Sequence, residues 1–220
     1  SIGVMQVGQE REPVVVIEHF APDPDRLRQH AACTSFGVGD LHYPGIKGPL
    51  PTDYFVDLQP IIATVMVDIF GFRGGARVLG ATYAIVTASP DHLSVEQRIP
   101  HVDAIDPGRM AIMHYLAHGD DDGTAFYRHR STGFETLSEA RSPAYFAALN
   151  TELRQQPLPP GYICGDTPLF ERTAAVESVY NRALIYRSRM FHSGSISAGR
   201  DLPADPATGR LTIASFLAAR

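Results

Sequence analysis

The feature that most restricts the fold is a series of short extended segments separated by turn residues, concentrated in the second half of the chain. Arg109 to His118 is the clearest, because Met110 and Ile112 alternate with Ala111 and Met113 and would lie on opposite faces of a strand. Further strands are expected at residues 13–17, 81–87, 124–130, 170–179, 182–191 and 210–217. Many short strands are typical of a β-sandwich or jelly roll.

Three segments have helical rather than extended patterns. Asp23 to Cys33 has helical composition after a proline-containing entry, and Leu58 to Phe70 has apolar residues at helical spacing. Ser142 to Gln155 combines a Ser-Pro entry with apolar residues on one side. The sequence therefore predicts a mainly β fold with flanking helices, of the α+β class. With 220 residues it fits one domain, in which residues 1–90 form an α/β support and residues 91–220 form the β-rich core.

Two connections between strands follow from turn residues. Asp120–Gly123 predicts a turn into the strand at 124–130. Tyr180–Asn181 is expected to join the segments 170–179 and 182–191 as paired strands, and the second of these ends at His192.

Two regions contain too many glycines and prolines for regular structure. Ser35 to Asp53 and Gly194 to Gly209 are expected to be long surface loops. The first is either a functional lip, with His42, Tyr43 and Lys47 as weak candidates for substrate contact, or a connector that only wraps the core.

Composition excludes several classes of partner. The net charge of −5 gives no basic field for nucleic acid, and no apolar run approaches the length of a membrane span. Cys33 and Cys164 lack a CxxC spacing, so neither a disulfide framework nor a cysteine zinc site is indicated and a cytoplasmic location is expected. A homodimer is among the oligomeric states that the sequence allows.

The strongest candidate site combines His101-Val102-Asp103 with His192. On an extended segment, two residues in an i, i+2 relation point to the same face, so His101 and Asp103 could hold one metal ion. A histidine from a neighbouring strand would complete the two-histidine, one-carboxylate triad that leaves positions of Fe(II) open for ligands. The competing interpretation is that these histidines fall near strand ends by chance.

His114 and His118 form a rival metal pair, since a separation of four residues places both on one face of a helix or strand. There is no HExxH pattern, and His114 lies among Met110, Ile112 and Leu116. A histidine satisfied within the core or a loop is the favoured interpretation.

The motifs from Gln97 to Leu217 occur in a familiar order. They are His-x-Asp, a strand with an interior tyrosine, Gly-Thr-x-Phe-Tyr, His-Ser-Gly and a closing Arg-x-Thr. This order resembles the Fe(II)- and 2-oxoglutarate-dependent dioxygenase superfamily, most closely an uncharacterised bacterial branch of its prolyl-hydroxylase-like group. The resemblance implies a double-stranded β-helix, that is, a cupin-like jelly roll, in residues 91–220.

The resemblance also implies roles for individual residues. His101, Asp103 and His192 would be the iron ligands and catalytic centre. Arg210 would pair with the carboxylate of 2-oxoglutarate, with Thr212 and Tyr115 adding hydrogen bonds. Arg210 follows His192 at a greater separation than is usual in the family, and Arg200 lies nearer the usual spacing. Arg200, however, lies in a segment with the composition of a loop, so Arg210 is preferred. The greater separation from His192 is interpreted as a loop insertion.

The activity implied is hydroxylation by an oxidoreductase that uses Fe(II), O2 and 2-oxoglutarate, and Asp103 argues against halogenation. The substrate would be a small molecule, in particular an amino acid or peptide, with Tyr127, Arg128, Arg130 and Arg189 as candidate contacts. A solvated outer face is the other interpretation of Arg128 and Arg130. The alternative function is a non-catalytic or 2-oxoglutarate-independent, cupin-like metal-binding jelly-roll domain.

Overall fold

The computed structural model describes residues 1–40, 42–118 and 122–220. The strands are β1 Ile2–Val7, β2 Glu12–Ile17, β3 Gly37–Val38, β4 Gly45–Gly48, β5 Ala76–Val86, β6 Arg109–Tyr115, β7 Thr124–His129, β8 Phe170–Val176, β9 Ala183–Arg187, β10 His192–Gly194 and β11 Leu211–Ala219. The α-helices are α1 Pro24–Ala32, α2 Gln59–Asp68 and α3 Ser142–Gln155. The predicted turn at Asp120–Gly123 lies largely outside the described residues.

The strands form two antiparallel sheets. The major sheet has eight strands in the order β1-β2-β9-β6-β11-β5-β4-β3, and the minor sheet has three in the order β10-β7-β8. Strands from residues 1–90 and from residues 91–220 therefore share the major sheet. The fold is mostly β with a few helices, as the sequence predicted.

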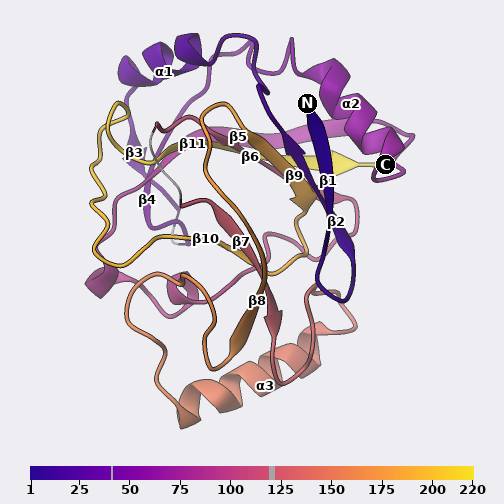
Figure 1. Cartoon of the computed structure of the whole chain (residues 1–220), viewed down its shortest axis with the longest axis vertical. Coiled ribbons are helices and arrows are strands. Elements are labelled where there is room, and N and C mark those ends of the chain that lie inside the picture. The colour runs from indigo at the N-terminus through magenta and orange to yellow at the C-terminus, as the bar shows by residue number, and fades with distance from the viewer. Residues whose placement is uncertain (41, 119–121) are drawn as a thin grey trace.

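The elements stack in four layers (Figure 1). One core lies between α1, α2 and the outer face of the major sheet, and a second lies between the two sheets. A third core lies between the minor sheet and α3, which covers the end of the molecule opposite α1 and α2 (Figure 1). Among the described residues, none of the helices combines the length and apolar composition that a membrane crossing requires.

Strand β6 confirms the predicted alternation and explains it. Met110 and Ile112 belong to the core under α1 and α2, whereas Ala111 and Tyr115 belong to the core between the sheets. Both faces of β6 are buried, so both sets of alternating residues are apolar or hydrogen-bonded.

The predicted pairing across Tyr180–Asn181 is wrong. β8 belongs to the minor sheet, while β9 lies between β2 and β6 in the major sheet. Asn181, with φ of 60°, turns the chain from one sheet to the other. Its side chain is fixed by two hydrogen bonds to the backbone of Ala21, each 2.9 Å, and its N–H donates to the carbonyl of Tyr115 at 2.9 Å.

The expectation of a loop throughout residues 35–53 is also incorrect. This region contains β3 and β4, and β4 pairs with β5. A Cβ atom at Gly45 would collide with the carbonyl of Ile85, so glycine is what allows β4 to approach its neighbour. Strand β1 was not expected either, because the start of the chain was interpreted as polar.

Candidate metal centre

His101, Asp103 and His192, here called the triad, meet at one point. Each offers a ligand atom, and these atoms all lie within 4.8 Å of one another. Nε2 of His101 is 3.5 Å from Oδ1 of Asp103, and Nε2 of His192 is 3.5 Å from Oδ2 of the same carboxylate. The three residues that the sequence singled out are thus brought together with a carboxylate between two imidazoles.

Backbone hydrogen bonds hold the triad. His101 and His192 exchange both of their backbone bonds at 2.9 Å, so the two histidines are paired like residues of adjacent strands. The N–H of Asp103 donates to the carbonyl of Ser188 at 2.9 Å. On the other side, β10 places His192 opposite Phe126 of β7. Each ligand is positioned by main-chain contacts independently of any ion.

The protonation of the triad suits a cation. Nδ1 of His192 lies 2.9 Å from the carbonyl oxygen of Met190, which can only accept, so Nδ1 carries the proton and Nε2 is left to face Asp103. Burial lowers the pKa of His192 to about 4, despite the opposing effect of Asp103. Burial acts to raise the pKa of Asp103, but the nearby His192 and His101 outweigh it and lower that pKa below its ordinary value. Near neutral pH the centre therefore offers a neutral imidazole and a carboxylate.

One side of the triad is closed by aromatic rings and the other is open. The ring of Tyr186 is 4.9 Å from that of His192 and 5.1 Å from that of Phe126. The side chain of His101, by contrast, is 53% exposed. Burial raises the pKa of Tyr186 well above its ordinary value, with a contribution from Asp103. Sequence analysis missed Tyr186, although its alternation with the buried Ile185 places it on the face toward the minor sheet.

The residues predicted to bind the co-substrate also lie together. Thr212 pairs directly with Tyr115 across β11 and β6, and the hydroxyl of Tyr115 is 2.7 Å from that of Thr124. Thr124 pairs with Gly194 in β10, and Gly194 lies against the guanidinium of Arg210. These five residues, here called the Arg210 cluster, are linked in series from β11 and β6 of the major sheet to β7 and β10 of the minor sheet.

Arg210 is buried and lies immediately before β11. One of its guanidinium nitrogens, Nη2, donates to the carbonyl of Gly123 at 2.7 Å. Burial raises the pKa of Tyr162 to about 12, while the charge of Arg210 acts to lower it. Arg200, the other candidate, is in the loop before β11, with Nη1 3.7 Å from the carboxylate of Asp122. Of the two, Arg210 is the one that lies inside the fold.

Lys47 lies in β4. Its ammonium pairs with Asp40 at 2.5 Å and lies 5.0 Å from the ring centroid of Tyr43. The charge of Lys47 is also near enough to help lower the pKa of Asp103. Lys47 borders an open pocket of about 590 Å³, whose other walls include Tyr54 and the edge of β5. His42 lies in an exposed turn that Asp40 caps.

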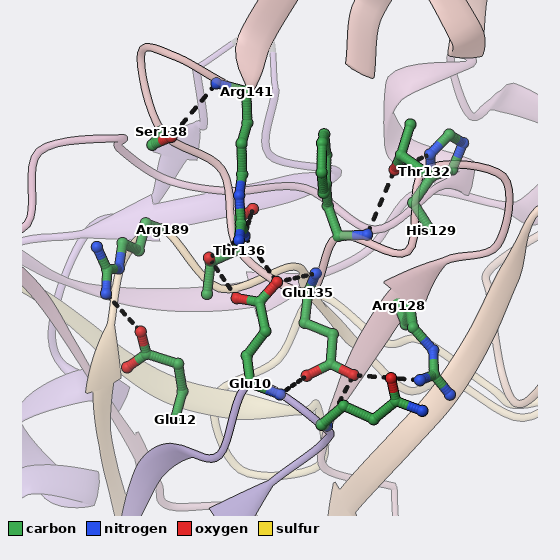
Figure 2. A network of polar contacts seen from close by, with 12 residues as sticks. Glu10, Glu12, Arg128, His129, Thr132, Glu135, Thr136, Ser138, Arg141 and Arg189 are labelled. Atoms are coloured by element: carbon green, nitrogen blue, oxygen red, sulfur yellow. Dashed lines mark hydrogen bonds and ion pairs between the residues drawn. The ribbon is translucent and has the colours of Figure 1, made fainter. Parts of the chain in front are cut away.

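The four candidate substrate contacts are buried or paired with acidic residues of the chain. Tyr127 is buried in the core beneath α3. The arginines are held by acidic residues: Arg128 by Glu171 at 2.8 Å, Arg130 by Asp166 at 3.3 Å, and Arg189 by Glu12 at 2.5 Å. Figure 2 shows Arg128 and Arg189 within a network of such contacts.

His114 is a core residue, as favoured from the sequence. Its Nδ1 is 3.1 Å from the hydroxyl of Tyr54, and its Nε2 is 3.0 Å from Oδ1 of Asn181. Both ring nitrogens therefore have protein partners. The ring of His118 instead lies against that of Tyr180 in a tilted arrangement, with 4.0 Å between the ring centroids.

Residues 1–217 match the model of a family of unknown function, DUF6445, and the chain belongs to that family. No curated protein matches the sequence.

Among solved structures, one similar chain is HygX from Streptomyces hygroscopicus with nickel, 2-oxoglutarate and hygromycin B bound, at 12% identity and a TM-score of 0.45, over 93% of this chain and 82% of that one. A second is EvdMO1, at 12% identity and a TM-score of 0.42, over 99% of this chain and 55% of that one. A third is an oxidoreductase of the 2OG-Fe(II) oxygenase family from Burkholderia pseudomallei, at 8% identity and a TM-score of 0.33, over 99% of this chain and 72% of that one. With TM-scores below 0.5, these similarities assign no function to the chain.

Proposed function

We propose that this member of the DUF6445 family is a non-haem Fe(II) oxygenase that couples decarboxylation of 2-oxoglutarate to hydroxylation of a substrate. The observation that carries the proposal is the triad, whose two imidazoles and one carboxylate lie within 4.8 Å of one another. This donor set is typical of Fe(II) oxygenases, because it leaves coordination positions for the co-substrate and O2. The order of the sequence motifs supports the same conclusion.

The residues of the chain fit the metal. His192 is held by the carbonyl of Met190 with Nε2 available, and Asp103 is ionised, so two of the ligands are ready without rearrangement. Bound iron would supply the oxidative chemistry. Tyr186 and Phe126 exclude water from the buried side of the triad, while the exposed His101 marks the side from which ligands reach it.

Arg210 is the proposed partner of the 2-oxoglutarate carboxylate distant from the metal. Its guanidinium can form paired hydrogen bonds with a carboxylate, and its buried position strengthens such pairing. Thr212 and Tyr115 are buried beside it and offer hydroxyl groups in the Arg210 cluster. We further propose that the two sheets form the double-stranded β-helix of this superfamily, and that the substrate is a small molecule such as an amino acid or peptide.

The test is release of succinate from 2-oxoglutarate by protein loaded with Fe(II) in the presence of ascorbate and O2. Wild type should form succinate above a protein-free control, and His101→Ala or Asp103→Ala should abolish the excess because each loses a metal ligand. Full turnover in both variants would overturn the triad. No turnover by wild type, with metal bound, would favour the metal-binding domain without 2-oxoglutarate chemistry.

The two arginines provide a matched comparison. Arg210→Gln should raise the 2-oxoglutarate concentration needed for half-maximal turnover at least tenfold, roughly the effect of losing a charge-assisted hydrogen bond. Arg200→Gln should leave that concentration within about twofold of wild type. The reverse result would identify Arg200 as the anchor.

A further inference from the structure

Strand β1 is an edge strand of the major sheet, and its register with β2 is unbroken. It pairs with β2 on one side only. Ser1 and Glu18 exchange two hydrogen bonds, of 3.0 and 3.3 Å, which fixes the alternation of the ladder. Residues 3, 5 and 7 therefore bond to β2, and the N–H and C=O groups of Ile2, Val4 and Gln6 point away from it. Pro13, which has no N–H, lies opposite Gln6 and agrees with this assignment.

Nothing in the sequence of β1 protects this edge. Its six residues, Ile2–Val7, include no charged residue and no proline, the usual means by which natural sheets prevent strand addition. The rest of the major sheet is protected. Its opposite edge is the two-residue β3, and the open part of β5 contains Arg77 and a break in register opposite Phe216 and Leu217.

The side chains of β1 are also exposed on both faces of the sheet. Ile2 and Val4 are 45% and 47% exposed on the face that carries α1 and α2, and Met5 is 36% exposed on the other. A strand added to β1 would cover apolar surface on both faces as well as the backbone groups at the edge.

We propose that two copies of the chain associate through β1, in antiparallel pairing about a two-fold axis at Val4. In this register Val4 lies opposite Val4 of the partner subunit, and Ile2 lies opposite Gln6 of the partner subunit. It is the register in which all three outward-pointing residues form hydrogen-bonded pairs, so the edge is complementary to itself. Because β1 carries no charged residue, two copies of it can pair without repulsion between like charges. The two major sheets become one continuous sheet.

Mass measurement tests the association. Sedimentation velocity of the full chain at tens of micromolar should give twice the 24.0 kDa of one chain. Val4→Pro should shift the protein to a monomer, with the dissociation constant raised at least tenfold, because it removes an outward N–H that β2 does not use. Val4→Thr retains that N–H and β-branching and should remain a dimer. A monomeric wild type, or a Val4→Pro protein that stays dimeric, would overturn the proposal.

Cross-linking tests the register and does not depend on the proline variant folding. In a background in which the exposed, free Cys33 and Cys164 are replaced by serine, Val4→Cys should form a disulfide-linked dimer on oxidation. Residues opposite one another in a hydrogen-bonded pair have Cα atoms about 5.5 Å apart, within disulfide range. Met5→Cys is the control, since the two Met5 positions would be diagonal and about 7–8 Å apart. Equal or greater linking through Met5→Cys would overturn the register.

Discussion

At the scale of single residues, Asn181 and His114 show how one buried polar contact decides the course of the chain. Oδ1 of Asn181 accepts both the N–H of Ala21 and the Nε2–H of His114, and the hydroxyl of Tyr54 completes the imidazole. With His114 neutral, each polar atom of the imidazole has a partner: Nε2–H donates to Asn181, and Nδ1 accepts from the hydroxyl of Tyr54. Burial lowers the pKa of His114 to about 4, although Asn181 acts to raise it.

Stability should therefore fall on acidification. Well above pH 6.5, His114 is neutral in both the folded and the unfolded chain and adds no pH dependence. Below pH 6.5, His114 binds a proton in the unfolded chain but stays neutral in the folded chain. The free energy of unfolding should therefore decrease by up to about 1.4 kcal/mol per pH unit toward pH 4. Urea unfolding at pH 7.5, 6 and 5 measures this slope.

Substitution separates His114 from other groups. His114→Gln should flatten the slope in part, since the buried His192, with its pKa also lowered to about 4, contributes in the same direction. His92→Gln, at an exposed position, should leave the slope as in wild type. An unchanged slope in His114→Gln would contradict the assignment.

At the scale of elements, the turn of the β1–β2 hairpin is hydrogen-bonded to the segment at Glu135 and Thr136, which in turn pairs with the chain just before His192 (Figure 2). The carboxylate of Glu135 accepts the N–H groups of Gln9 and Glu10, at 3.0 and 2.9 Å, in the turn of the hairpin. In return the carboxylate of Glu10 accepts the N–H of Glu135 and the hydroxyl of Thr136, at 3.1 and 2.6 Å. Thr136 then pairs with Met190, two residues before His192.

Glu135→Gln should destabilise the fold by about 1–3 kcal/mol, because an amide cannot accept through both of its terminal atoms and the Glu135 side chain is only 6% exposed. Glu139→Gln changes an exposed acid in the same connection and should alter the free energy of unfolding by less than about 0.5 kcal/mol. Urea titration of the two variants at pH 7.5 makes the comparison. An equal change in the free energy of unfolding in both variants would show that the Glu135 carboxylate does not stabilise the contact between the hairpin and this segment.

Elements that depend on local pattern could be predicted from the sequence, and those that depend on partners could not. The alternation in β6 and the helical spacing of α2 were sufficient to predict both. Tyr180–Asn181 has the same turn composition whether the chain reverses within a sheet or crosses to another, so the destination of β9 was not encoded locally. Likewise the spacing of His101 and Asp103 predicted their shared face, whereas the contributions of Tyr186 and Lys47 depend on how β9 and β4 are placed.

At the scale of the whole molecule, the triad joins segments that are far apart in the chain, so a cation bound there should stabilise the entire fold. With the ion at about 100 times its dissociation constant, the expected gain is about 2.7 kcal/mol. Thermal unfolding with and without Fe(II) under anaerobic conditions should show a higher Tm for wild type with metal. Asp103→Ala should show no such increase, and an equal increase in that variant would place the ion elsewhere.

Strand β11 has a consequence for how the protein is made. It is the last strand along the chain, yet it lies between β5 and β6 near the middle of the major sheet. During synthesis, the edges of β5 and β6 that pair with β11 therefore stay unpaired until residues 211–219 have left the ribosome. Pairings between such distant segments form slowly, and the waiting edges are exposed to aggregation. The order of the strands therefore predicts that the nascent chain stays prone to aggregation until β11 is inserted between β5 and β6.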